Sequence, residues 1–182
     1  MRPRDVSKVL SALIPTRKPV CLWGRPGLGK SAVVRQAADT LRLKLIDVRA
    51  TRLDPVDLRG LPKVTKDRAE WCPPSFLPRS GDGVLFLDEL AQAPPMVQAA
   101  GLQLVLDRRI GEYELPAGWS VIAASNRQED RAGTHRRITP HLNRFVHVDR
   151  EIGVEDWPAS SRSRSPWASR PGRRCAAGGV SA

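Results

Sequence analysis

Residues 24–31 carry the side-chain types and the spacing needed to bind a chain of phosphates. They form a complete G-x-x-x-x-G-K-[ST] motif, which reads Gly24, Arg25, Pro26, Gly27, Leu28, Gly29, Lys30 and Ser31. Glycines let the backbone turn tightly, so that successive N–H groups face an anion, and the lysine reaches the β- and γ-phosphate oxygens. The Ser31 hydroxyl suits Mg²⁺. The motif predicts a nucleotide site, against the alternative of a glycine-rich turn without function.

Two carboxylates follow an apolar run further along the chain. Residues 84–87 precede Asp88 and Glu89, which is the pattern of a buried parallel strand ending at the ligand-binding edge of a sheet. We expect Asp88 to hold Mg²⁺, directly or through water, and Glu89 to orient and polarise the water that attacks the γ-phosphate. An Asp-Glu pair is also common where a strand enters a charged turn, and the phosphate loop upstream favours the catalytic interpretation.

The surrounding sequence alternates between predicted strands and helices. Apolar runs predict strands at 19–23, 43–48, 84–87, 119–126 and 144–148, and helical spacing predicts helices at 6–14, 31–41, 94–106 and 138–143. The Pro- and Gly-rich segment 49–80 predicts a functional loop or a small hairpin, and 109–116 predicts a short hairpin. This alternation indicates an α/β fold with a parallel sheet flanked by helices.

The composition is that of a soluble globular protein. Of the 182 residues, 41% are hydrophobic and 27% are charged. No apolar run approaches the roughly 18 residues that cross a membrane, and the first residues do not form a signal peptide, so we expect a cytoplasmic protein without a membrane partner. The odd set of Cys21, Cys72 and Cys175 lacks C-x-x-C spacing, which indicates neither a disulfide framework nor a zinc site.

The net charge of +11 is unevenly distributed. Residues 1–156 hold 25 Lys plus Arg against 19 Asp plus Glu, whereas 157–182 hold five Arg and no acidic residue. Such a surface favours anionic partners by steering, but the aromatic residues are too scattered for a nucleic-acid partner to be expected. Residues 158–182 are mostly Ser, Arg, Pro, Gly and Ala, so we expect a disordered basic tail after a folded core at 1–157.

Residues 3–157 resemble the core of an AAA+ ATPase, specifically the MoxR-like branch with an insertion in its second helix. The resemblance rests on five elements in the same order: the phosphate loop (Walker A), 54–62, 85–90 (Walker B), 121–127 and 142–145. It implies a parallel P-loop NTPase sheet flanked by helices that binds ATP and Mg²⁺ and hydrolyses the ATP. It also implies a chaperone-like ring of identical subunits that remodels a protein partner.

Two further site residues come from this resemblance. Asn126 matches the first sensor, which helps to position the attacking water, although an Asn can also simply turn a strand into a loop. Arg144 matches the arginine finger that reaches a neighbouring subunit's nucleotide. Arg136 and Arg137 compete for that role, and Arg144 is otherwise a surface charge.

The resemblance also sets expectations for the insertion and for the end of the chain. Residues 54–78 match the inserted hairpin and pore-facing loop, where Trp71 either engages a partner or fills a local apolar cluster. We expect the family's helical lid to be missing after Asp156, and the abrupt change in composition suggests a truncated or frameshifted reading frame. We therefore also consider an ATP-binding module without turnover.

Overall fold

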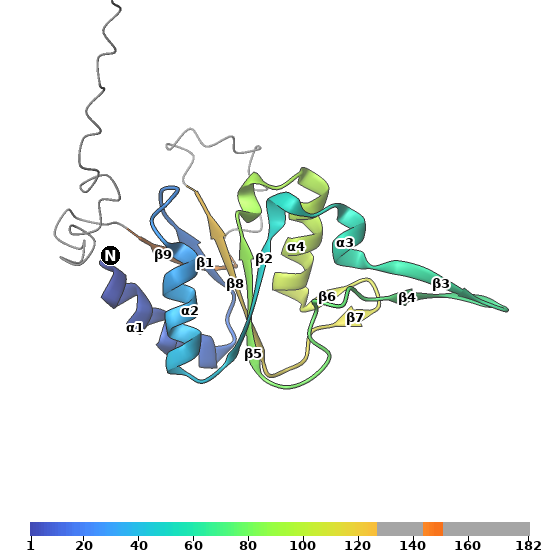
Figure 1. Ribbon diagram of the computed structural model, residues 1–182, viewed down its shortest axis with the longest axis horizontal. Helices are drawn as coiled ribbons and strands as arrows, with labels where there is room; N and C mark the ends of the chain where they lie inside the picture. Colours follow the sequence, from blue (N-terminus) through green and yellow to red (C-terminus); the bar gives the residue numbers. More distant parts are fainter. Residues whose placement is uncertain (127–143, 151–182) are drawn as a thin grey trace, which may run out of the picture. The chain divides into compact units, whose positions relative to one another are not determined.

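The computed structural model describes residues 1–126 and 144–150, which belong to a compact unit, Met1–Ile152. Its centre is a five-stranded sheet in the order β2-β5-β8-β1-β9, and every neighbouring pair is parallel (Figure 1). The strands are β1 Val20–Trp23, β2 Lys44–Arg49, β5 Gly83–Asp88, β8 Trp119–Ser125 and β9 Val146–Asp149. All residues of β5 and β8 are buried, which is typical of strands covered on both faces.

Helices cover both faces of this sheet. On one face, α1 (Pro3–Leu13) and α2 (Lys30–Thr40) pack Val6, Leu10 and Val34 against Phe86 and Ile122. On the other face, α4 (Pro95–Asp107) packs with a cluster that includes residues of β5 and β8. Pro15 limits the first helix as expected, because α1 ends at Leu13 and one 3-10 turn, η1 (Ile14–Thr16), follows.

The segment between β2 and β5 contains more structure than a loop with a hairpin. It begins with a 3-10 turn, η2 (Ala50–Arg52), and a short helix, α3 (Pro55–Arg59). A reciprocal capping box of Asp54 and Asp57 starts α3, with Pro55 in the first turn. Sequence reasoning missed this helix, although the D-P-V-D pattern is a readable start signal.

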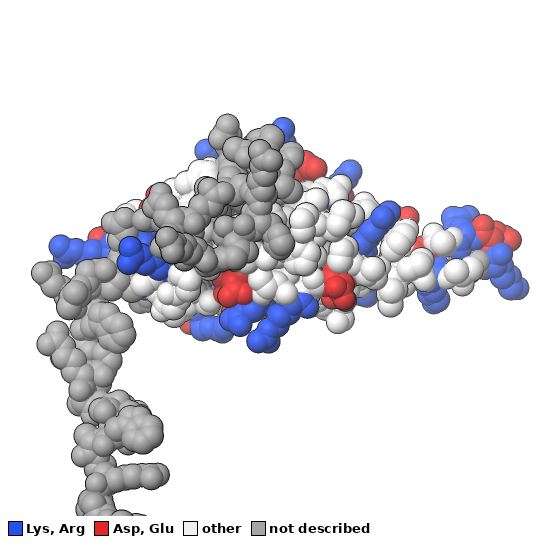
Figure 2. Space-filling model, turned by 90° about the horizontal axis from the view of Figure 1, so that it is seen from above, with Lys and Arg blue, Asp and Glu red and all other residues white. Residues whose placement is uncertain are grey.

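A two-stranded hairpin then projects from the core and forms one end of the described unit (Figure 1). Its strands are β3 (Leu61–Thr65) and β4 (Arg68–Cys72). They pair antiparallel, with Leu61 opposite Cys72 at the base and Thr65 opposite Arg68 at the tip. Exposed basic and acidic side chains gather at its outer end (Figure 2). The apolar side chains of Leu61 and Val64 are 66% and 81% exposed, so the hairpin adds little to the core.

The predicted elements within the described residues are confirmed, with boundaries that shift by up to three residues, the largest shift being at the start of α1. They include the short hairpin of β6 (Arg109–Ile110) and β7 (Tyr113–Glu114). The predicted helix 138–143, Arg136 and Arg137, and the predicted tail 158–182 lie outside the described residues. In the described part of the chain, no helix is long and apolar enough to cross a membrane, and no cluster of His, Cys, Asp or Glu could hold a metal by itself.

Candidate nucleotide-binding site

The order of the strands brings the sequence motifs to one edge of the sheet. β8 lies between β1 and β5, so the loop after β1, Asn126 after β8 and Asp88 at the end of β5 are neighbours. Parallel strands end at the same edge, and this is where ligands bind in open α/β sheets. The fold therefore assembles a site from segments that are far apart in the sequence.

The loop of residues 24–31 has the backbone geometry of an anion cradle. Gly27 and Gly29 have backbone φ values of 77° and 67°, which residues other than glycine rarely adopt. Gly29 is the N-cap of α2, whose first-turn N–H groups and dipole favour negative charge. The loop can therefore bind a phosphate through its backbone.

The Lys30 ammonium lies inside this cradle and is 8% exposed. Its Nζ donates to the carbonyl oxygens of Gly24 at 2.9 Å and Arg25 at 3.2 Å, and to Oδ1 of Asn126 at 2.7 Å. Lys30 thus joins the phosphate loop to the end of β8. A phosphate that enters the loop would compete with these oxygens for the ammonium.

Ser31 and Asp88, the two residues that the sequence predicts to hold Mg²⁺, are in contact. Oγ of Ser31 donates to Oδ2 of Asp88 at 3.2 Å, and the Glu89 backbone N–H donates to Oδ1 at 3.0 Å. Burial raises the pKa of the Asp88 carboxyl, and the Glu89 charge adds to this, whereas the Ser31 and Glu89 hydrogen bonds and the Lys30 charge oppose it. A hydroxyl beside a desolvated carboxylate fits Mg²⁺, because the cation would offset the cost of burying the charge.

The Glu89 carboxylate contacts two residues at the end of β2 and just after it. Oγ1 of Thr51 donates to Oε2 of Glu89 at 2.7 Å, and Nε of Arg49 lies 3.9 Å from the same oxygen. The backbone of Glu89 has a φ of 58°, which costs energy for a residue with a Cβ. Sequence reasoning did not select Arg49 or Thr51, and the signal is spatial, since Arg49 pairs with Asp88 across the two strands.

These groups line one pocket of about 270 Å³, which contains residues of the phosphate loop together with Arg49, Asp88, Glu89 and Asn126. The site residues predicted from the sequence therefore converge, with Arg144 as the exception. Arg144 is exposed and does not line the pocket. It precedes β9, whose first residue, Val146, pairs with Val20, so Arg144 lies at the opposite edge of the sheet from the phosphate loop.

Arg150 is a further residue that sequence reasoning missed. It follows β9, its backbone N–H donates to the Trp23 carbonyl at 2.8 Å, and it is only 6% exposed. Its Cβ would be 3.4 Å from a Cβ at Gly24, and its Nη1 would be 3.7 Å from one at Gly29. The guanidinium therefore lies against the phosphate loop and adds positive charge beside it.

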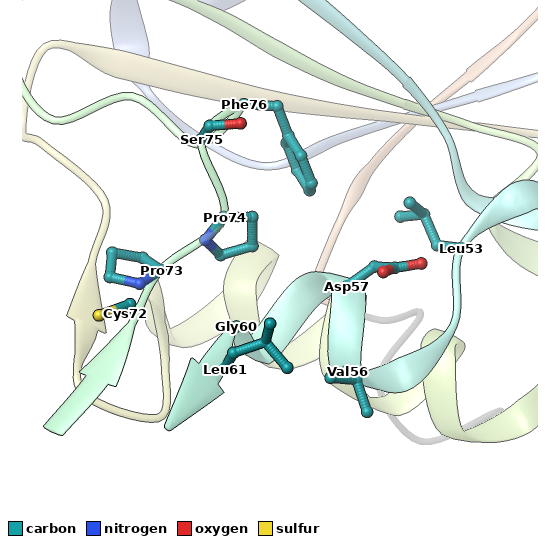
Figure 3. Close-up of a pocket in the computed structure, with 10 residues that line it drawn as sticks. All are labelled: Leu53, Val56, Asp57, Gly60, Leu61, Cys72, Pro73, Pro74, Ser75 and Phe76. Atoms are coloured by element: carbon teal, nitrogen blue, oxygen red, sulfur yellow. The ribbon is translucent and has the colours of Figure 1, made fainter. Parts of the chain in front are cut away.

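A second pocket, of about 590 Å³, lies at the base of the projecting hairpin. Figure 3 shows its residues around a hollow, with α3 on one side and the Cys72–Phe76 segment on the other. Nearby, the Arg59 guanidinium lies 4.4 Å from the centre of the Trp71 ring, and the Trp71 N–H donates to Oε2 of Glu112 at 3.5 Å. Trp71 is half-buried under Arg59, so part of its surface is already covered within the chain.

Solved structures of similar fold include a "putative ATPase" and a protein named NtrX. A "putative ATPase" from Cytophaga hutchinsonii aligns with a TM-score of 0.61 at 23% identity, covering 84% of this chain and 47% of that one. NtrX from Brucella abortus aligns with a TM-score of 0.56 at 19% identity, covering 80% and 35%. NtrX in complex with ATP gives 0.55 at 19% identity, covering 81% and 34%. At these identities the likeness concerns the fold, and the chain spans about half or less of each structure.

The family is shown by the sequence itself. The profile of the AAA domain (dynein-related subfamily) matches residues 19–145, from the start of β1 to the start of β9. This range contains the phosphate loop, both carboxylates, Asn126 and Arg144, and it covers well over half of the chain. The chain belongs to the AAA domain family, in its dynein-related subfamily.

Proposed function

We propose that this chain binds ATP with Mg²⁺ and hydrolyses the ATP, as a MoxR-like AAA+ ATPase that works in a ring and remodels a protein partner. The observation that carries the proposal is the contact between Ser31 and Asp88 at 3.2 Å, which joins the phosphate loop to the acidic end of β5. A cation, a triphosphate and a base are needed at one point for hydrolysis, and the pocket supplies groups for all three.

In this proposal the loop residues 24–29 and the N-terminus of α2 bind the phosphates through backbone N–H groups. Lys30 binds the β- and γ-phosphate oxygens, and Ser31 and Asp88 would hold Mg²⁺, which would supply positive charge to the phosphates when bound. Glu89 orients the attacking water and polarises it, while Asn126 helps to position that water near the γ-phosphate. Attack is in line, with ADP as the leaving group.

Arg144 is proposed to act on the nucleotide of a neighbouring subunit. Because it lies at the amino edge of the sheet, the length of β9 separates it from its own phosphate loop, roughly 13 Å for four residues. Its exposed side chain is instead available to another copy of the chain. The test is to mix Arg144→Ala with Glu89→Gln subunits: turnover above that of either variant alone supports action between subunits, and no gain at any ratio contradicts it.

The test of hydrolysis uses two variants with matched controls. Lys30→Ala should abolish nucleotide binding, while Lys8→Ala, at an exposed lysine of α1, should bind normally. Glu89→Gln should bind ATP and release little phosphate, whereas Glu70→Gln in the exposed hairpin should turn over normally. Unchanged turnover in Glu89→Gln would refute the role given to Glu89.

A second candidate is an ATP-binding module that does not turn over. It is favoured by one observation, the hydrogen bond and ion pair that hold the Glu89 carboxylate against Thr51 and Arg49. Glu89 would have to give up these contacts before it could move to a water molecule at the γ-phosphate. Binding of ATP that Lys30→Ala abolishes, without measurable phosphate release from the wild-type chain, would favour this candidate.

A further inference from the structure

We propose that Gln92 is the positioning residue that fixes the side-chain amide of Asn126. Asn126 is 7% exposed, and its Oδ1 accepts a hydrogen bond from Lys30 Nζ at 2.7 Å. An amide in this orientation points its Nδ2 away from the ammonium, and a buried NH₂ group needs an acceptor there. The inference rests on the proposed hydrolysis, in which Asn126 helps to position the water.

Gln92 supplies that acceptor. Its own amide orientation follows from its neighbours, because only one of the two satisfies both ends. In that orientation Oε1 accepts from the Asn126 backbone N–H at 3.0 Å and from Asn126 Nδ2 at 3.2 Å, and Nε2 donates to the Glu89 carbonyl at 3.2 Å. The Gln92 side chain thus connects Glu89, the proposed base, to Asn126, which contacts Lys30.

The turn that carries Gln92 is itself held in place. Gln92 ends η3 (Leu90–Gln92), and the Ala91 N–H donates to Oγ of Ser125 at 3.1 Å. Nε2 of Gln98, a side chain only 4% exposed, donates to the carbonyls of Ala91 at 3.1 Å and Ala93 at 2.8 Å. These bonds come from β8 and α4, so the Gln92 acceptor is preorganised before nucleotide arrives.

The consequence concerns turnover more than binding. Without the Gln92 oxygen, rotation of the Asn126 amide loses one hydrogen bond, the one from Lys30, in place of two, so Oδ1 is held less firmly. Lys30 keeps its contacts with the Gly24 and Arg25 carbonyls, and the loop backbone is unchanged. Ground-state binding should therefore persist while the alignment of the water is lost.

The test compares Gln92→Met, which removes both polar ends at similar length, with Gln92→Glu, which keeps an oxygen acceptor. Gln103→Met, at an exposed position of α4, is the control. We expect Gln92→Met to lower kcat about tenfold, which corresponds to a loss of about 1.4 kcal/mol of transition-state stabilisation. The KM for ATP should stay within about twofold of the wild-type value. Gln92→Glu should recover most of the lost turnover, and Gln103→Met should match the wild type.

A second readout does not depend on hydrolysis. In ¹H–¹⁵N spectra, the Asn126 side-chain NH₂ pair, assigned by its loss in Asn126→Asp, should exchange slowly in the wild type and in Gln92→Glu, and rapidly in Gln92→Met. Wild-type exchange and kcat in Gln92→Met, or a Gln92→Glu variant as impaired as Gln92→Met, would overturn the inference while hydrolysis stands. A wild-type chain without turnover would instead refute the proposed hydrolysis, and the spectra would still decide the role of Gln92.

Discussion

Replacing Thr51 by Val should increase ATP turnover. In the structure, Oγ1 of Thr51 donates to Oε2 of Glu89 at 2.7 Å, so the carboxylate is held toward β2. If Glu89 must leave Thr51 to reach the attacking water, then the energy of this hydrogen bond is part of the barrier to turnover. Valine keeps the shape of threonine and removes only the hydroxyl.

The size of the effect follows from the environment of the bond. A hydrogen bond to a charged group contributes roughly 1.5–3 kcal/mol when it is shielded from water, but Thr51 is exposed and the Glu89 side chain is 36% exposed. We therefore take about 1 kcal/mol, which corresponds to about a fivefold change in equilibrium. The nearby Arg49 contributes less, because an ion pair at 3.9 Å with half-exposed partners is weak.

The assay is steady-state phosphate release with saturating Mg·ATP. We expect Thr51→Val to raise kcat up to about fivefold with little change in KM. Thr40→Val is the matched control, because the exposed Thr40 also donates a 2.7 Å hydrogen bond, to the Gln36 carbonyl far from the pocket. A fall in kcat of Thr51→Val at unchanged KM would refute the reasoning and assign Thr51 to the productive orientation of Glu89.

Three further predictions concern stability and pH. Asp88→Asn should raise the unfolding free energy at pH 7, because burial favours the neutral carboxyl, and the gain should fade as the pH falls to the ordinary pKa of 3.8. Tyr113, the only tyrosine, should titrate with a pKa of about 12, so stability should fall between pH 10 and about 12 in the wild type more than in Tyr113→Phe. Gly83→Ala should cost about 2 kcal/mol, because its Cβ would lie 2.6 Å from the Lys44 carbonyl oxygen and the Trp119 ring.

Each of these has a direct measurement. Urea titrations at pH 7 and pH 4 compare Asp88→Asn with the wild type, and a loss of stability at pH 7 would mean that the Ser31 hydrogen bond outweighs burial. Ultraviolet titration of the folded protein follows Tyr113, whose hydroxyl donates to the Pro78 carbonyl at 2.6 Å, and an ordinary pKa near 10 would show that burial does not protect it. An unfolding midpoint of Gly83→Ala equal to that of the wild type would show that β2 and β5 adjust freely.

The sequence predicted the parts of the site that lie within continuous motifs. The strand before Gly24, the helix after Gly29 and the apolar run before Asp88 each have local patterns of hydrophobicity and glycine that determine their structure. Asn126 could be predicted as well, because the family resemblance selects it and it directly follows an apolar strand. These residues converge in the structure as the motifs indicated.

The contacts that orient these residues could not be predicted in the same way. Thr51 contacts Glu89, and Gln92 contacts Asn126, only because β5 lies between β2 and β8. No local sequence pattern predicts this strand order. Arg150 reaches the phosphate loop for the same reason, since β9 lies beside β1. An arginine or glutamine outside a motif reads as a surface residue until the neighbouring strands are known.

The pairing of Leu61 with Cys72 gives the projecting hairpin an unusual independence. The chain leaves the core and returns to it at one place, and the intervening residues are almost all exposed. Lengthening, shortening or exchanging this segment would alter neither the order of the central strands nor the spacing of the nucleotide pocket. Evolution can therefore change the contacts of the hairpin, and a protein engineer can graft a new sequence there, without altering the central sheet or the nucleotide pocket.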